Sequence, residues 1–239
     1  MVTQHPEGHP CAEAAHGHEP VLVSRDDGLT WARQTPCCHL CARPSAQRRD
    51  LGQAEPQSHA ATGSPASPSA EKARALIPAG SSIALGSGTT VFGLANLLDD
   101  LPHGTIYTNS MQAADALARV AGLEVHISGG IIRSHTGTII GSEAADYFRS
   151  LKQVDYAFIG CDAIDLRGEV YSDNISVAAA EKTILLSAKH KYILCDPSKI
   201  GKTAVAHITS LSVCDGLITS RSASDAAEGF YGDVKVIYA

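Results

Sequence analysis

The sequence predicts an α/β domain with an open, mostly parallel sheet and helices on both faces, preceded by a head of low order. From residue 71 onward, short apolar segments alternate with amphipathic stretches of roughly 10 to 15 residues, a pattern typical of βαβ units. Composition changes near residue 70: residues 1–70 hold 8 of the 11 prolines and no Ile, Phe, Tyr or Lys. We therefore predict two parts, a Pro/His/Cys-rich head at 1–70 and a folded domain at 71–239.

The overall composition excludes several classes of protein. The chain has 239 residues, of which 44% are hydrophobic and 18% charged, and its net charge is -6. These values exclude a collagen, a disordered polyanion and a generally basic nucleic-acid binder. No apolar run reaches the roughly 18 residues of a membrane-spanning helix, and the first residues lack the order of a signal peptide. We therefore expect a cytoplasmic protein without membrane contact.

The elements follow from the local patterns in chain order. In the first long helix, apolar residues such as Val91, Leu94 and Leu98 recur at helical spacing, whereas the strands are short apolar runs bounded by turn residues. Helices are expected at 71–77, 91–101, 111–121, 142–151, 174–188 and 222–230. Strands are expected at 81–85, 105–109, 123–128, 154–160, 191–196, 206–209, 216–219 and 234–238. The segment 131–141 is either an antiparallel excursion or the cover of a site.

A glycine-rich turn follows the first strand of the domain and opens the next helix. Its residues are Gly86, Ser87, Gly88, Thr89 and Thr90. The glycines allow a tight turn with N–H groups on one side, the threonines add hydroxyl donors, and the helix N-terminus adds partial positive charge. This combination suits a phosphate dianion, although it is neither a Walker loop nor a GxGxxG pattern. The alternative is an ordinary strand-to-helix turn capped by a threonine.

Two further turns end strands that lie beside this one. Asn109 and Ser110 follow the second strand, and Gly129 and Gly130 follow the third. Taken singly, the first pair is an ordinary helix cap and the second an ordinary turn. Because the carboxyl ends of parallel strands meet at one edge of the sheet, the three turns together predict a ligand site there.

Acidic residues follow the fourth strand and continue into the next helix. Asp162 stands just past the strand end, where a carboxylate can accept hydrogen bonds from sugar hydroxyls. Asp165 is expected to turn the loop. A helix cap explains Asp173 or Asn174 as well as a ligand contact does, and Glu181 is expected on the solvent-exposed face of the helix.

Lys199 follows the fifth strand, after Asp196 and Pro197. A lysine at this edge supplies a second charge for a phosphate or carboxylate, and an ordinary surface lysine is the alternative.

The seven cysteines predict neither a disulfide framework nor a metal site. Cys38 and Cys41 have the CxxC spacing of zinc ligands, but no second well-spaced pair accompanies them. Cys161, Cys195 and Cys214 fall near predicted strand ends and are expected to be reduced thiols in or near the core. We predict no metal and no other cofactor.

The ordered set of these motifs resembles the C-terminal sensor domain of the DeoR-type bacterial transcriptional repressors. The matching segments span residues 76–219 and are LIPAGSSIALGSGTT, TNS, HISGG, TGTIIG, VDYAFIGCDAID, EKTILLSA, ILCDPSKIGKTA and CDGLIT. The resemblance implies the fold of ribose-5-phosphate isomerase A, a phosphorylated sugar or polyol as inducer, and assembly into a homo-oligomer. It also implies that Gly86 to Thr90 and Lys199 hold the phosphate. Asn109, Gly129, Gly130 and Asp162 would then line the sugar end.

The family also carries an N-terminal winged helix that binds DNA, and here the head departs from the pattern. Residues 48–51, Arg-Arg-Asp-Leu, resemble the end of the recognition helix, but no apolar-periodic helices precede them. The head holds five arginines against seven acidic residues, a balance unfavourable for contact with DNA. The resemblance thus predicts a transcriptional regulator of carbohydrate metabolism that is not an enzyme, while its head leaves DNA binding by this chain in doubt.

An aldose–ketose isomerase of sugar phosphates is the alternative on the same fold. That chemistry needs a carboxylate base and a group that stabilises the enediolate. Asp162 and Asp165 are the paired acids best placed for it. The sequence lacks the Glu and the Lys-Gly-Gly turn that the isomerase family shows.

Overall fold

The computed structural model describes residues 21–24, 31–34, 67–220 and 235–239, and the chain divides into two compact units, Met1–Ala61 and Thr62–Ala239. In the first unit, β1 (Val21–Ser24) pairs antiparallel with β2 (Trp31–Gln34). The sequence predicted no regular element there, because four-residue strands are too short to show a period. The pair Cys38 and Cys41, residues 48–51 and the helix expected at 222–230 lie outside the described residues.

The second unit is built on a seven-stranded sheet, which confirms the predicted fold class. The strand order is β14-β13-β11-β8-β3-β4-β5, and every neighbouring pair is parallel. The strands are β3 (Ser82–Leu85), β4 (Gly104–Thr108), β5 (Leu123–Ile127), β8 (Val154–Ile159), β11 (Ala188–Leu194), β13 (Gly216–Thr219) and β14 (Val236–Tyr238). The sheet is open, because β5 and β14 stand at its two edges.

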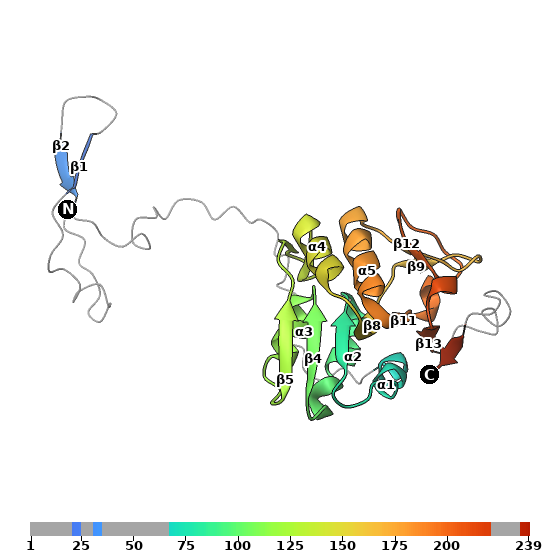
Figure 1. Ribbon diagram of the computed structural model, residues 1–239. Helices are drawn as coiled ribbons and strands as arrows, with labels where there is room; N and C mark the ends of the chain where they lie inside the picture. The colour runs from blue at the N-terminus through green and yellow to red at the C-terminus, as the bar shows by residue number, and fades with distance from the viewer. Residues whose placement is uncertain (1–20, 25–30, 35–66, 221–234) are drawn as a thin grey trace. The chain divides into compact units, whose positions relative to one another are not determined.

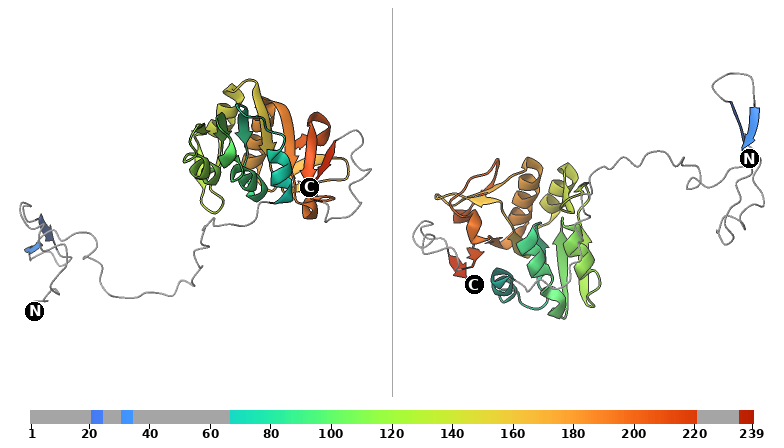
Figure 2. Two further views of the ribbon diagram at one scale, coloured as in Figure 1. Left: turned by 90° about the horizontal axis from the view of Figure 1, so that it is seen from below. Right: turned by 180° about the vertical axis from the view of Figure 1, so that it is seen from behind.

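Helices cover both faces of this sheet, as Figures 1 and 2 show. One face carries α1 (Pro68–Arg74), α2 (Thr89–Ala95) and α3 (Met111–Leu117); the other carries α4 (Ser142–Ser150) and α5 (Ile175–Ser187). Helix α1 begins three residues before the predicted start, because the Ser67 side chain caps it and Pro68 fits the first turn. Helix α2 ends at Ala95, and the 3-10 turn Leu98–Asp100 replaces the rest of the expected helix.

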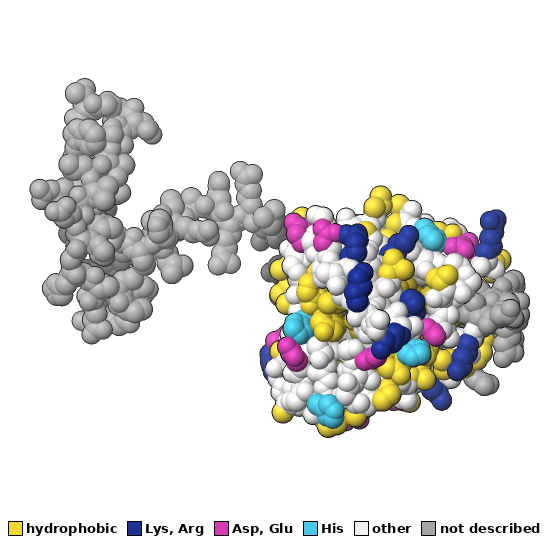
Figure 3. Space-filling model, in the orientation of Figure 1, with side chains coloured by type: hydrophobic (Ala, Val, Ile, Leu, Met, Phe, Trp, Pro, Cys, Tyr) yellow, Lys and Arg dark blue, Asp and Glu magenta, His cyan; other side chains and the backbone are white. Residues whose placement is uncertain are grey.

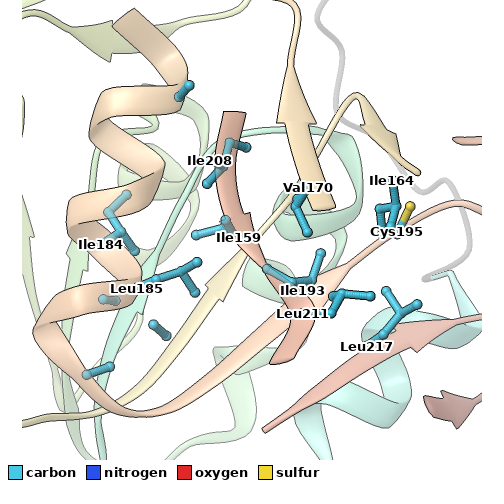
Figure 4. Close-up of a cluster of buried hydrophobic side chains, with 14 of the residues drawn as sticks. Ile159, Ile164, Val170, Ile184, Leu185, Ile193, Cys195, Ile208, Leu211 and Leu217 are labelled. Carbon is cyan, nitrogen blue, oxygen red and sulfur yellow. The ribbon is translucent and has the colours of Figure 1, made fainter. Parts of the chain in front are cut away.

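The core consists of two layers, one on each face of the sheet. Successive side chains of a strand point alternately into one layer and the other. In β3, Ile83 and Leu85 face the layer under α1 to α3, and Ala84 faces the layer under α4 and α5. In β8, Phe158 faces the first layer and Ile159 the second. Figure 4 shows the second layer, where side chains of α5 meet the sheet: Ile159, Ile164, Val170, Ile184, Leu185, Ile193, Cys195, Ile208, Leu211 and Leu217. Two-sided burial explains why these strands are continuous apolar runs.

Two small antiparallel units complete the domain. The hairpin of β6 (Ile131–Arg133) and β7 (Thr138–Ile140) confirms the antiparallel excursion expected at 131–141. A three-stranded sheet has the order β12-β10-β9, with β9 (Ala163–Ile164), β10 (Glu169–Ser172) and β12 (Ala206–Ser210). Sequence reasoning missed β9 and β10. It also placed 206–209 as a strand without its partner.

Charged side chains of both signs are interspersed on the face of the second unit that Figure 3 shows. None of the helices among the described residues is long and apolar enough to cross a membrane.

Candidate functional site

The sheet has a topological switch point between β3 and β8. From β3, inside the sheet, the chain adds β4 and β5 on one side and then returns to add β8, β11 and β13 on the other. At such a switch point two neighbouring loops leave in opposite directions and open a crevice beyond the strand ends. The loops that flank it are residues 86–90 after β3 and residues 160–162 after β8. All the predicted turns lie at this same edge, because the strands are parallel.

The loop at 86–90 is anchored to β8 at its first residue and has an uncapped helix start at its other end. The Gly86 N–H donates to the Phe158 carbonyl at 2.9 Å. Gly88 is the N-cap of α2 with φ +111°, and a Cβ built there would meet nothing within 4 Å. No side chain among the described residues caps α2, so the threonine-capped turn considered above is not present. Gly88 and Thr89 are exposed and Thr90 is partly exposed, whereas the donors of Gly86 and Ser87 are engaged inside the protein.

Glu181 lies behind this loop, and the prediction that it faces solvent is wrong. The side chain is 2% exposed, and its Oε1 accepts hydrogen bonds from the Ser87 N–H and the Ser87 hydroxyl, both at 2.9 Å. Gly86 makes this approach possible: a Cβ there would overlap Oε2 and lie 2.8 Å from Cδ. Burial raises the pKa of Glu181 to about 7 against the opposing effect of the two Ser87 hydrogen bonds, and the Asp162 carboxylate adds to the rise.

The sequence carried only a partial signal for Glu181. Apolar residues occupy nearly every side of α5, a pattern that favours burial of much of the helix. Lys182 and Leu186 of the same helix are nevertheless exposed, so the pattern alone does not decide which side Glu181 faces. A buried carboxylate is costly unless it is paired and hydrogen-bonded.

Asn109 and Ser110 end β4 under the β6–β7 hairpin. Asn109 is fully buried, and its amide donates to the Ile139 carbonyl at 3.3 Å. Ser110 caps α3 by accepting from the Ala113 N–H at 3.3 Å, as the simpler interpretation of this pair expected. The hairpin therefore packs over the end of β4, and its second interpretation, as the cover of a site, stays a prediction.

Gly129 and Gly130 are exposed at the start of the hairpin. Gly130 has φ +130°, and a Cβ there would overlap the Ile140 carbonyl oxygen. Gly129 is unconstrained, since the nearest atom to a Cβ would be 4.0 Å away. The hairpin alone therefore accounts for Gly130 but leaves Gly129 unexplained.

Asp162 and Lys199 come together at the ends of the neighbouring strands β8 and β11, on the side of the switch point opposite the loop at 86–90. The Lys199 Nζ lies 3.6 Å from the Asp162 Oδ1 and donates to the Cys161 carbonyl at 3.3 Å. The Asp162 Oδ2 accepts from the Ser172 hydroxyl and the Asp173 N–H, both at 2.9 Å. Both side chains remain more than a third exposed, so a ligand could reach either.

Asp165 serves the loop that it was expected to turn. Its Oδ1 accepts from the Arg167 and Glu169 N–H groups, and its Oδ2 accepts from the Tyr171 hydroxyl. Asn174 caps α5. With Asp165 engaged by its own loop, the pair of acids that the isomerase alternative needs is not available.

The buried polar atoms without a partner lie along this edge, spread from the end of β5 to the end of β13. Among the described residues they are Asn109 Oδ1, Ser128 Oγ, Glu181 Oε2 and Thr219 Oγ1. Asn109, Ser128 and Thr219 end or follow parallel strands, and Glu181 touches the loop after β3. Sequence reasoning missed Ser128, although it directly precedes Gly129. Native structures rarely leave buried polar groups unpaired.

The described cysteines are free thiols. Cys195 is buried, and Cys161 and Cys214 are partly buried, as expected. Among the described residues, no group of three or more His, Cys, Asp or Glu could hold a metal ion.

Comparison with known proteins places this chain in a family. The model of the DeoR C terminal sensor domain matches residues 69–221. The glycerol-3-phosphate regulon repressor of Escherichia coli (strain K12) is 27% identical over 150 residues, which are 63% of this chain and 59% of that protein. The HTH-type transcriptional repressor CsqR of the same organism is 31% identical over 150 residues, 63% and 57% of the two chains.

This chain thus spans about three fifths of the length of these relatives. Among solved structures, ribose 5 phosphate isomerase A from Neisseria gonorrhoeae is 16% identical with a TM-score of 0.41, covering 55% of this chain and 51% of that one. The match of the family model to well over half of the residues shows that the chain belongs to the family of DeoR C-terminal sensor domains.

Proposed function

We propose that this chain is a transcriptional regulator of carbohydrate metabolism, not an enzyme, and that its sensor domain binds a phosphorylated sugar or polyol as effector. The observation that carries the proposal is the uncapped loop at 86–90 beside the switch point, behind which the buried Glu181 Oε2 has no partner. The relatives support the ligand class, since one of them is named a glycerol-3-phosphate regulon repressor.

In this proposal the phosphate binds at Gly86 to Thr90 and Lys199. The exposed N–H and hydroxyl groups of the loop donate to the phosphate oxygens, and the lysine ammonium adds a charge from the other side of the switch point. Asp162 accepts from hydroxyls of the carbon chain. Ser110 and Gly130 shape the site through the cap and the hairpin, whereas Asn109 and Gly129 line the end away from the phosphate.

The ligand would regulate by biasing the geometry of a DNA-bound homo-oligomer. A coupling free energy of about 1–3 kcal/mol between the two sites is typical of such regulation. The oligomer and DNA binding by this chain are both parts of the proposal.

A thermal-shift screen of the full chain tests the ligand class. The panel holds sugar and polyol phosphates together with their dephosphorylated partners. A ligand present at 100 times its dissociation constant stabilises the folded state by about 2.7 kcal/mol. We expect a rise in Tm with one or a few phosphorylated compounds and none with the partners. A panel without any shift would refute the proposal.

Calorimetry then tests the site. Lys199→Gln should weaken binding of the compound found, whereas Lys202→Gln, which removes an exposed lysine three residues away, should not. Equal affinities for all three proteins would show that the phosphate binds elsewhere.

A further inference from the structure

Glu181 has an environment that no other charged side chain in the described part of the chain has. It is the one charged residue there that is buried, with 2% of its surface exposed. Its Oε1 takes both hydrogen bonds from Ser87, and its Oε2 has no partner. Among the described residues no basic side chain forms an ion pair with it. The carboxylate is therefore desolvated without a countercharge, which is the most costly way to bury a charge.

The groups around α5 do not offset this charge. Asp162, beyond the end of β8, is the charged neighbour that acts on Glu181, and it is acidic; its own cation is Lys199. On the other elements that pack against α5, the acidic side chains contact histidine, lysine or arginine. Glu169 of β10 contacts His207 of β12, and Lys189 of β11 contacts Asp155 of β8. His190 of β11 contacts Asp215, and Asp146 contacts Arg149 within α4. Glu143 in α4 accepts from Ser142, and the Lys191 N–H of β11 donates to Asp215.

At its position behind the loop, an ionised Glu181 would repel an anionic ligand. Ser87, whose N–H and hydroxyl both donate to the carboxylate, is a member of the loop that would hold the phosphate. A dianion on the outer side of this loop and a carboxylate on its inner side repel each other through a desolvated region, where charges interact strongly. Protonation of Glu181 removes the repulsion and still leaves Oε1 to accept from Ser87.

We propose that Glu181 couples effector binding to proton uptake, so that a dianionic phosphorylated ligand binds at residues 86–90 with the Glu181 carboxyl protonated. This inference rests on the proposed function and deepens it. The proton comes from solvent and attaches to Oε2, the oxygen that has no partner.

The direction of the pH dependence follows from linkage. The pKa of Glu181 is about 7 without ligand, because burial disfavours the charged form. A bound dianion raises this pKa further. Above neutral pH the free protein must therefore take up a proton on binding, and affinity falls by up to about tenfold for each pH unit. Below about pH 6 the carboxyl is already protonated, and this contribution to the pH dependence vanishes.

Isothermal titration calorimetry in buffers of different ionisation enthalpy measures the proton uptake. The probe is glycerol 3-phosphate, or whichever compound of the panel shifts the Tm, titrated into the full chain at about pH 8. At that pH a phosphate ester with a second pKa of about 6 is already dianionic, so any uptake occurs on the protein. The wild type is compared with Glu181→Gln and with Lys182→Gln, which removes an adjacent exposed charge.

We expect uptake approaching one proton for the wild type and Lys182→Gln, and none for Glu181→Gln, whose affinity should also stay constant between about pH 6 and pH 8.5. Binding by the wild type without proton uptake would overturn this inference and leave the proposed function standing. Binding of no phosphorylated compound would overturn both. If Glu181→Gln does not fold, the buffer dependence of the wild type alone decides.

Discussion

Replacement of Gly86 by alanine tests whether the buried carboxylate and the loop form one packed unit. An added Cβ would overlap the Glu181 Oε2 and lie 2.8 Å from Cδ and 3.0 Å from Oε1, well inside ordinary contact distance. The carboxyl group cannot move aside freely, because it is buried and tied to Ser87. Overpacking of this kind costs about 1–3 kcal/mol. Loss of the two Ser87 hydrogen bonds adds about 1 kcal/mol each, so the total is about 3–5 kcal/mol.

Urea denaturation of the full chain measures this loss. The seven tyrosines all lie after residue 100, so tyrosine signals report on the sensor unit, whereas the single tryptophan, Trp31, lies in the head. The matched control is Gly93→Ala in α2. A Cβ there meets Ala70 Cβ at an ordinary 3.6 Å, and alanine favours a helix over glycine by about 1 kcal/mol. The control should therefore be neutral or more stable.

The double variant separates a steric clash from backbone strain. Glu181→Ala removes the group that the new methyl meets, so Gly86→Ala should cost much less in that background than in the wild type. A loss below about 1 kcal/mol in the wild-type background would refute the reasoning, as would an equal loss in both backgrounds.

Three further predictions concern charge and backbone. The pKa of Glu181 in the folded protein, about 7, exceeds its ordinary value of 4.5. Its contribution to the free energy of unfolding is therefore complete below pH 4.5 and is lost as the pH rises to 7. Denaturation at several pH values should show that the free energy of unfolding falls by about 3 kcal/mol over this range in the wild type but not in Glu181→Gln. Asp155 behaves oppositely, because hydrogen bonds from Ser82 lower its pKa to about 2; its contribution is lost as the pH falls from 3.8 toward 2, and acid unfolding of Asp155→Asn should lack that step. Gly130→Ala should lower the free energy of unfolding by more than about 2 kcal/mol, since it combines φ +130° with overlap of the Ile140 carbonyl. Gly129→Ala should be nearly neutral. Equal Tm values for the two variants would contradict the conclusion that the hairpin constrains Gly130 alone.

The sequence was sufficient for the parallel sheet because both its strands and its helices carry strong local patterns. Strands such as β8 are long apolar runs, and the polar or glycine turns that follow them locate the carboxyl edge. The small sheet lacks such patterns. β9 has two residues, and β10 finds its partner in β12 more than thirty residues later, so only the folded chain shows that these segments pair.

The same distinction applies to the site. The turns could be located because each directly follows a strand, and Asp162 and Lys199 were placed at one edge by topology alone. Glu181 could not be placed in that way, since its burial depends on α5 packing against the sheet, α4 and the small sheet at once. A position within a helix gives only the direction of a side chain. What covers that side is decided by tertiary structure.

The two edges of the sheet differ in a way that favours a functional origin for the unpaired atoms. At the amino edge, polar groups are matched: Asp155 accepts from Ser82 and Lys189, and Asp215 accepts from the Lys191 N–H. At the carboxyl edge, four buried atoms of the described residues have no partner, and one of them belongs to a carboxylate. Imperfect packing would leave unpaired atoms at either edge. Their position along the edge where α/β sheets bind ligands supports the effector site proposed above.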